Sequence, residues 1–182
     1  MTAELYHNFN ICATCQAMVA ENGRLRVEIT RLEWDETIGM LNAAGGFRAI
    51  NALPDGRYAL VFCDIDYLKQ INSATGNHMQ TNRYLMSGLR VRRGEIAIRL
   101  MGDEFLFILT DGRGYADPVG FVERLTHQLA EQPLTAAERA GLPGGALSAT
   151  FAWRASVKRA DIRAAIERLS AAVLAQKAAR PC

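Results

Sequence analysis

The sequence of 182 residues lacks the long apolar runs that membrane proteins need. No segment approaches the roughly 18 consecutive apolar residues of a membrane-spanning helix, and the N-terminus lacks the basic-then-apolar order of a signal peptide. A surplus of charge is also missing, because the net charge is +2 and no basic run marks a face for nucleic acid. We therefore expect a cytoplasmic protein that binds neither membranes nor nucleic acid.

Cysteine is scarce as well. Only four residues are cysteine, and two of them, Cys12 and Cys15, form a single CxxC. A zinc site usually needs a second such pair, and a redox pair is expected beside a strand in a thioredoxin-like unit. The sequence shows neither pattern. The thiols are therefore predicted to be ordinary and reduced, as is typical inside cells.

The composition that is present, 49% apolar and 22% charged, is ordinary for a globular protein, and the length suits one compact domain with an extension. In residues 1–34, apolar side chains recur at steps of four and three from Ile11 to Leu32, which is typical of a short heptad pattern. Asn22 falls at an a position, where one asparagine favours two parallel helices in fixed register. Asn22-Gly23 is also a turn signal. Two interpretations stay open: a continuous dimerising helix, or a bent or split helix packed on its own domain.

Residues 35–182 read as one domain of mixed helices and strands. Predicted strands cover residues 58–63, 96–100, 105–109 and 146–153. Predicted helices cover residues 35–53, 67–71, about 15 residues ending at 93, 119–129 and 162–173, with a loop at 72–76, a turn at 111–114 and a helical turn at 135–140. A strand hairpin combined with helical crossovers predicts an α+β fold of the ferredoxin-like or polymerase-palm kind, with a mostly antiparallel sheet.

Two acidic clusters fall at the ends of predicted strands. Asp64-Ile65-Asp66 ends one strand, and Asp103-Glu104 occupies the turn of the hairpin. Acids at a buried strand end cost desolvation energy unless a cation meets them. Each pair alone is often only a surface turn. If the strands are neighbours, however, the clusters meet and supply the oxygen ligands that suit Mg²⁺, which activates a hydroxyl group and steadies a leaving pyrophosphate.

Several ordered motifs resemble the GGDEF domain of diguanylate cyclases. Residues 64–72 (DIDYLKQIN), Gly76 with His78, and residues 99–105 (RLMGDEF) carry most of the similarity. The similarity extends to residues 35–42, 148–152 and 170–177, and so runs from about 35 to 180. The resemblance implies a palm-like nucleotide-cyclase fold. It also implies Mg²⁺-dependent condensation of two GTP into cyclic di-GMP across a homodimer interface, with pyrophosphate released and Mn²⁺ as an alternative metal.

The resemblance also implies roles for individual residues. Asp64, the carbonyl of Ile65, Asp103 and Glu104 are expected to hold the metal, and Asp103 and Glu104 are the catalytic candidates, one of which assists removal of the ribose 3′-hydroxyl proton. The expected substrate contacts are Asn72 and Asn82 at guanine, Lys69, Lys177 and Arg180 at phosphates, and Gly102 where the backbone approaches the nucleotide.

The sequence departs from the family pattern at three places. Met101 replaces the first glycine of the signature, and Asn82 (or Thr81, depending on the alignment) replaces an acid that reads guanine. The inhibitory R-x-x-D motif aligns with Arg92 and Glu95; a solvated helix end explains the same residues. Three functions therefore stay open: a cyclase, with strict or relaxed base selectivity; a degenerate module that binds GTP or cyclic di-GMP without turnover; and an unrelated palm-type nucleotidyl transferase.

Overall fold

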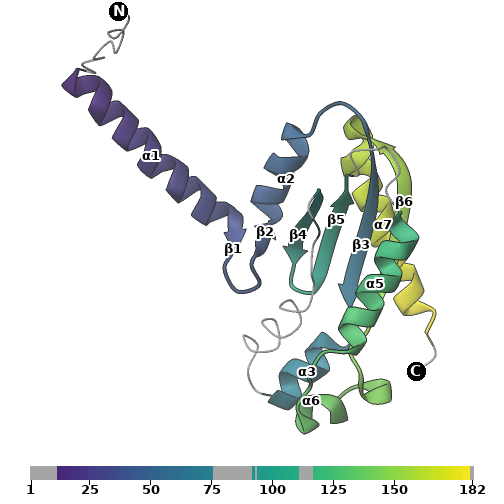
Figure 1. Ribbon diagram of the computed structural model, residues 1–182. Coiled ribbons are helices and arrows are strands. Elements are labelled where there is room, and N and C mark those ends of the chain that lie inside the picture. The colour runs from purple at the N-terminus through teal and green to yellow at the C-terminus, as the bar shows by residue number, and fades with distance from the viewer. Residues whose placement is uncertain (1–11, 76–91, 93, 111–116, 181–182) are drawn as a thin grey trace, which may run out of the picture. The chain divides into compact units, whose positions relative to one another are not determined.

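The computed structural model of the protein describes residues 12–75, 92, 94–110 and 117–180 (Figure 1). The chain divides into two compact units, residues 1–32 and 33–182, two residues before the predicted boundary. Among the described helices, none combines the length and the apolar character needed to cross a membrane.

The first unit contains most of one long helix, α1 (Ala13–Glu33). The helix continues without a break through Asn22 and Gly23. Of the two interpretations of this segment, the uninterrupted helix is confirmed and the split helix is wrong. None of its residues is buried. The apolar residues of its heptad pattern, which we call the seam, include Met18, Leu25 and Leu32, and these three are exposed. Its pairing with a second copy stays a prediction.

The second unit is built on one six-stranded sheet with the strand order β1-β2-β4-β5-β3-β6. The strands are β1 (Trp34–Asp35), β2 (Met40–Asn42), β3 (Arg57–Ile65), β4 (Glu95–Met101), β5 (Glu104–Leu109) and β6 (Ala149–Lys158). All neighbouring strands are antiparallel except β2 and β4, which are parallel. The predicted α+β fold with a mostly antiparallel sheet is confirmed.

Helices cover both faces of the sheet. They are α2 (Ala43–Ala52), α3 (Leu68–Thr75), α5 (Pro118–Ala130) and α7 (Ile162–Ala178), while the short helix α6 (Ala136–Ala140) contacts α3. Even-numbered side chains of β3, such as Leu60, share a core with α2 and α7, whereas odd-numbered ones, such as Val61, share a core with α3 and α5. Figure 1 shows α5 and α7 on opposite sides of the sheet. Because both faces of β3 are covered, its sequence is a continuous apolar run.

The predicted helix over 35–53 is wrong in its first half. The Asp35 carbonyl accepts from the Gly39 N–H at 2.8 Å, and the Asp35 carboxylate accepts from the Thr37 N–H at 3.0 Å, so a turn forms there. The helix begins only at Ala43, where the Asn42 side chain accepts from the Gly45 N–H at 3.0 Å. Asparagine is a favoured N-cap because it satisfies an otherwise unpaired amide of the first turn.

Two further boundaries differ from the prediction. α3 continues to Thr75, so the described part of the predicted loop at 72–76 is helical. β6 is shifted toward the C-terminus and runs from Ala149 to Lys158. Apart from Arg92, which is not helical, the predicted helix ending at 93 and the turn at 111–114 lie outside the described residues. The remaining predicted strands and helices are confirmed.

Replacing glycine with alanine is expected to destabilise the protein at one helical position and to stabilise a helix at another. A Cβ at Gly46 in α2 would overlap the side chain of Ile98, which is fully buried, so Gly46→Ala should lower the free energy of unfolding by about 2 kcal/mol. A Cβ at Gly23 in α1 meets no described atom within 4 Å. Gly23→Ala should therefore favour the helix by about 1 kcal/mol. Urea unfolding checks the first change and helical circular dichroism the second. An unchanged stability in Gly46→Ala would contradict the packing described for α2.

Candidate active site

The two acidic clusters meet at one end of the inner strands of the sheet, where β3 stops and the turn between β4 and β5 lies. β3 pairs with β5 so that Asp64 lies opposite Glu104. The turn between β4 and β5 brings Asp103 beside Ile65, whose N–H donates to the Asp103 carbonyl at 3.1 Å. Gly102 occupies this turn with a φ of 44°, a conformation that favours glycine. We call Asp64, Ile65, Asp103 and Glu104 the acidic edge.

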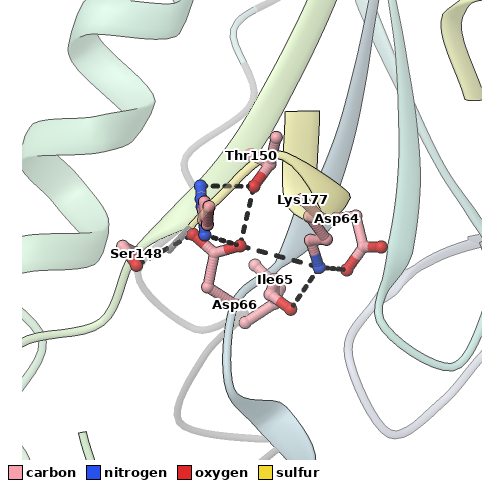
Figure 2. A network of polar contacts seen from close by, with 7 residues as sticks. Asp64, Ile65, Asp66, Ser148, Thr150 and Lys177 are labelled. Atoms are coloured by element: carbon pink, nitrogen blue, oxygen red, sulfur yellow. Dashed lines mark hydrogen bonds and ion pairs between the residues drawn. The ribbon is translucent and has the colours of Figure 1, made fainter. Parts of the chain in front are cut away.

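Lys177 brings a positive charge to this edge from α7. Its ammonium donates to the Asp64 carboxylate and, at 3.2 Å, to the Ile65 carbonyl (Figure 2). The same nitrogen lies 3.6 Å from the Asp66 carboxylate. A cation therefore already contacts two of the oxygen groups that were predicted to hold a metal.

The carboxylates of the acidic edge are close enough to repel one another. Burial raises the pKa of Asp64, an effect that the Lys177 ammonium opposes and the Asp103 charge reinforces. Burial also raises the pKa of Glu104, and the Asp64 and Asp103 charges add to the shift. A divalent cation at this place would relieve both the desolvation and the repulsion.

The donor set suits Mg²⁺ with an incomplete protein shell. Within the part of the chain that the structure describes, no three His, Cys, Asp or Glu side chains form a ready-made metal site. Mg²⁺, however, commonly takes only one or two protein carboxylates and completes its shell with water and substrate phosphates. Carboxylate oxygens from two neighbouring strands, with the Ile65 carbonyl beside them, match that mode of binding.

Neutralising Glu104 should stabilise the metal-free protein. Its folded-state pKa is raised, so ionised Glu104 lowers stability at neutral pH, and this loss disappears as the pH falls through the raised pKa. Glu104→Gln should therefore raise the melting temperature in EDTA by about 2 °C at neutral pH, and the difference should shrink in acid. Thermal unfolding across pH checks this. Glu123→Gln, on the exposed side of α5, is the control; a lower melting temperature in Glu104→Gln would contradict the repulsion.

Asp66 forms a separate network that joins β3 to β6. It is only 2% exposed, and its carboxylate accepts from the Ser148 hydroxyl at 2.9 Å and the Thr150 hydroxyl at 2.7 Å (Figure 2). Arg180 pairs with Asp66 at 2.9 Å and donates to the Thr150 hydroxyl at 2.6 Å. Burial would raise the pKa of Asp66, but the hydrogen bonds from Thr150, Arg180 and Ser148 outweigh it and lower the pKa. Asp66 is thus an ionised anchor behind the acidic edge.

Sequence reasoning missed this network. Asp66 was grouped with Asp64 but received no role of its own, and Arg180 was predicted to contact phosphate. The only sequence signal was the spacing of two between Ser148 and Thr150, which places both on one face of a strand. In the structure the guanidinium of Arg180 contacts Asp66 and Thr150, and its contact with phosphate stays a prediction.

Arg99 links the hairpin turn to the turn at Asp35. Its guanidinium donates to the Gly102 carbonyl at 2.9 Å and to the Asp35 carboxylate at 2.8 Å. Burial would raise the pKa of Asp35, but Arg99 outweighs this and lowers it. Met101 beside the turn is 72% exposed, and with Gly102 and Asn42 it borders an open hollow of about 410 Å³. The methionine that replaces a glycine therefore projects away from the protein interior.

The other predicted substrate contacts are only partly placed. Lys69 and Asn72 are three residues apart on α3, which follows the Asp64 strand end, and so share one face of that helix. Lys69 is exposed and Asn72 is half-buried. Asn82 and Thr81 lie outside the described residues. Contacts of these side chains with a nucleotide stay predictions.

The candidate inhibitory pair lies at the start of β4. The Glu95 carboxylate accepts from the backbone N–H of Arg92 at 2.6 Å and pairs with Arg124 of α5 at 2.6 Å. The Arg124 guanidinium also lies 4.9 Å from the centre of the Phe121 ring. Glu95 is thus engaged within the domain, while Arg92 is exposed. An inhibitory role for the pair stays a prediction.

Comparisons with known proteins agree with this geometry. The family described as diguanylate cyclase, GGDEF domain, matches residues 48–163, more than half of the chain. The structure resembles the coiled coil and GGDEF domain of DgcB from Caulobacter crescentus, solved with c-di-GMP, at 20% identity and a TM-score of 0.61, covering 91% of this chain and 93% of that one.

Two other solved structures show the same fold. Diguanylate cyclase SiaD from Pseudomonas aeruginosa, solved with its activator SiaC, is similar at 19% identity and a TM-score of 0.56, covering 90% of this chain and 68% of that one. The S helix-GGDEF-EAL part of Vibrio cholerae LapD, bound to c-di-GMP, is similar at 12% identity and a TM-score of 0.63, covering 90% and 38%. No curated protein matches the chain. The palm-like cyclase fold is therefore confirmed.

Proposed function

Because the chain belongs to the GGDEF domain family of diguanylate cyclases, we propose that it condenses two molecules of GTP into cyclic di-GMP and releases two pyrophosphates. The observation that carries this proposal is the acidic edge. There the strand end at Asp64 and Ile65 lies directly against Asp103 of the hairpin turn and Glu104 at the start of β5. Carboxylates on adjacent strands are what a metal-assisted phosphoryl transfer needs, because that chemistry depends on positioning and charge neutralisation.

The acidic edge supplies the groups for this chemistry. Asp64, the Ile65 carbonyl, Asp103 and Glu104 would hold Mg²⁺, which when bound neutralises phosphate charge and lowers the pKa of a hydroxyl group. One carboxylate of the hairpin, Asp103 or Glu104, would accept the proton of the ribose 3′-hydroxyl as a general base. Lys177 reaches the same edge and would bind a phosphate oxygen of GTP. Asn72 on α3 would contact guanine through its amide.

A product built from two nucleotides requires two such sites, and each chain carries one acidic edge. We therefore propose a homodimer in which each chain holds one GTP. The exposed seam of α1, with Met18, Leu25 and Leu32, supports helix pairing. The solved DgcB structure comprises a coiled coil and a GGDEF domain, and this chain matches 93% of its length.

A second candidate function is nucleotide binding without turnover. The replacement of a signature glycine by Met101 favours it, because bulk beside the turn impedes close approach of GTP. The exposure of the Met101 side chain and the presence of all four groups of the acidic edge favour turnover instead.

Product analysis separates these functions. The purified chain is incubated with Mg²⁺ and either GTP or GTP plus ATP, and the nucleotides are resolved by chromatography. A cyclase forms cyclic di-GMP, and a mixed cyclic dinucleotide in the second reaction would reveal relaxed base selectivity. Cyclic di-GMP binding by calorimetry with no cyclic dinucleotide formed would instead support the receptor function and contradict the cyclase.

A further inference from the structure

A hollow lined by basic side chains lies at the end of the sheet opposite the acidic edge. A hollow of about 350 Å³ between β6 and α7 is lined by four cationic side chains and one carboxylate, Arg57, Arg154, Lys158, Arg168 and Asp161; we call it the basic hollow. Arg57 begins β3, whereas Asp64 lies near the end of that strand. A rise of about 3.3 Å per residue separates the two by about 23 Å. The hollow is therefore distinct from the acidic edge.

An irregularity in β6 gives the hollow its shape. Tyr58 pairs with Val157 but Leu60 pairs with Arg154, so β6 holds one extra residue at this point. Ser156, within the bulge, has a φ of 61°, which is uncommon for a residue other than glycine. Bulges and left-handed residues re-aim side chains and are frequent at ligand sites.

The bulge keeps residues on both sides of it, Arg154 included, on the face of β6 that packs against α7. Ala152 and Val157 both pack in the core beneath α7, although a regular strand would send residues five apart to opposite faces. Arg154 follows Ala152 by two residues and so points to the same face. There it lines the hollow together with Arg168, and the small side chains of Ala164 and Ala165 leave the hollow open.

Arg57 is fixed in place at the rim. One of its guanidinium nitrogens donates to the Ser156 carbonyl at 2.8 Å and lies 3.2 Å from the Ser156 hydroxyl. A guanidinium has five N–H donors, so this anchor leaves others directed elsewhere. Within the described part of the chain, Arg154, Lys158 and Arg168 form no ion pair with a carboxylate. Four cations thus converge on one concave surface with only Asp161 to offset them.

We propose that the basic hollow binds a small soluble compound that carries a diphosphate group. The net charge of its lining, four cations against one carboxylate, matches the charge of about −3 that two linked phosphates carry at neutral pH. Guanidinium groups bind phosphate oxygens in pairs. The volume lies within the range of about 300–1,000 Å³ that is typical of small-molecule sites.

Calorimetry with inorganic pyrophosphate and with ADP tests this site. The titrations are done on the full chain in EDTA, because without divalent cations the acidic edge repels such anions. Binding of either probe is expected in the wild type. It should weaken at least tenfold in the double variant Arg154→Gln, Arg168→Gln, and also in Ala164→Leu, which fills the hollow without changing its charge.

Two controls keep the test specific. Arg163→Gln removes a cation of α7 that does not line the hollow, and Lys177→Gln removes the cation of the acidic edge; both should bind as the wild type does. Circular dichroism checks that each variant is folded. The proposal is overturned by absent binding of both probes, by undiminished binding in Ala164→Leu, or by loss of binding in Lys177→Gln. Equal competition by sulfate at matched ionic strength would also overturn it, because it would mean nonspecific attraction.

Discussion

Replacing Asp64 with asparagine is expected to lower the rate of cyclic di-GMP synthesis on the order of 10³-fold. Asp64 lies near the end of β3 directly opposite Glu104, and its carboxylate accepts from the Lys177 ammonium, so its charge serves both the metal and the lysine. Asparagine keeps the shape of the side chain and removes only that charge. The rate is measured as cyclic di-GMP formed from GTP under saturating Mg²⁺.

Asp55→Asn is the matched control for this change. Asp55 is also an aspartate of the same domain, but it is highly exposed, and its ion pair is with Arg159 at 2.7 Å. Its replacement should leave the rate unchanged. If Asp64→Asn kept more than a tenth of the wild-type rate while folded, the acidic edge would not be the catalytic site.

Removing residues 1–32 is expected to lower the rate per chain about 100-fold at submicromolar protein. The pairing of α1 would hold two domains at an effective concentration in the millimolar range, which separate domains reach only at high protein concentration. The truncation keeps Glu33, whose carboxylate pairs with Arg48 of α2. The rate per chain should then rise with protein concentration in the truncated protein and stay constant in the full chain.

Two single substitutions test the helix seam itself. Leu25 lies three residues after the a position of Asn22 and so at a d position; Leu25→Lys places a charge there and should dissociate the full chain in sedimentation experiments. Val27→Lys, on a more exposed residue of α1 outside the seam, should leave the dimer intact. A monomeric wild type, or equal effects of the two variants, would contradict pairing through this seam.

The parts of the fold predicted from sequence are those with a strong local signal. β3 is a continuous apolar run because helices cover both of its faces, and the Met101–Glu104 break marked the hairpin through its glycine and acids. The predicted helix over 35–53 was wrong because apolar spacing alone does not report the Asp35 turn or the Asn42 cap. Those features depend on single side-chain hydrogen bonds.

The less predictable parts of the site depend on contacts between residues far apart in the sequence. Asp66 is joined to Ser148 and Thr150 across more than 80 residues, and Lys177 reaches Asp64 across 113. No pattern within a segment reports such partners. The basic hollow was not predicted for a related reason: its bulge centres on Ser156, which is not a glycine and gives no turn signal.

The most direct test of the proposed function is the stoichiometry of the reaction with GTP and Mg²⁺. Pyrophosphate and cyclic di-GMP are measured together over time in the wild type and in Asp64→Asn. The proposal predicts two pyrophosphates for each cyclic di-GMP in the wild type and neither product above background in the variant. A folded, dimeric wild type that binds GTP but releases no pyrophosphate would contradict it.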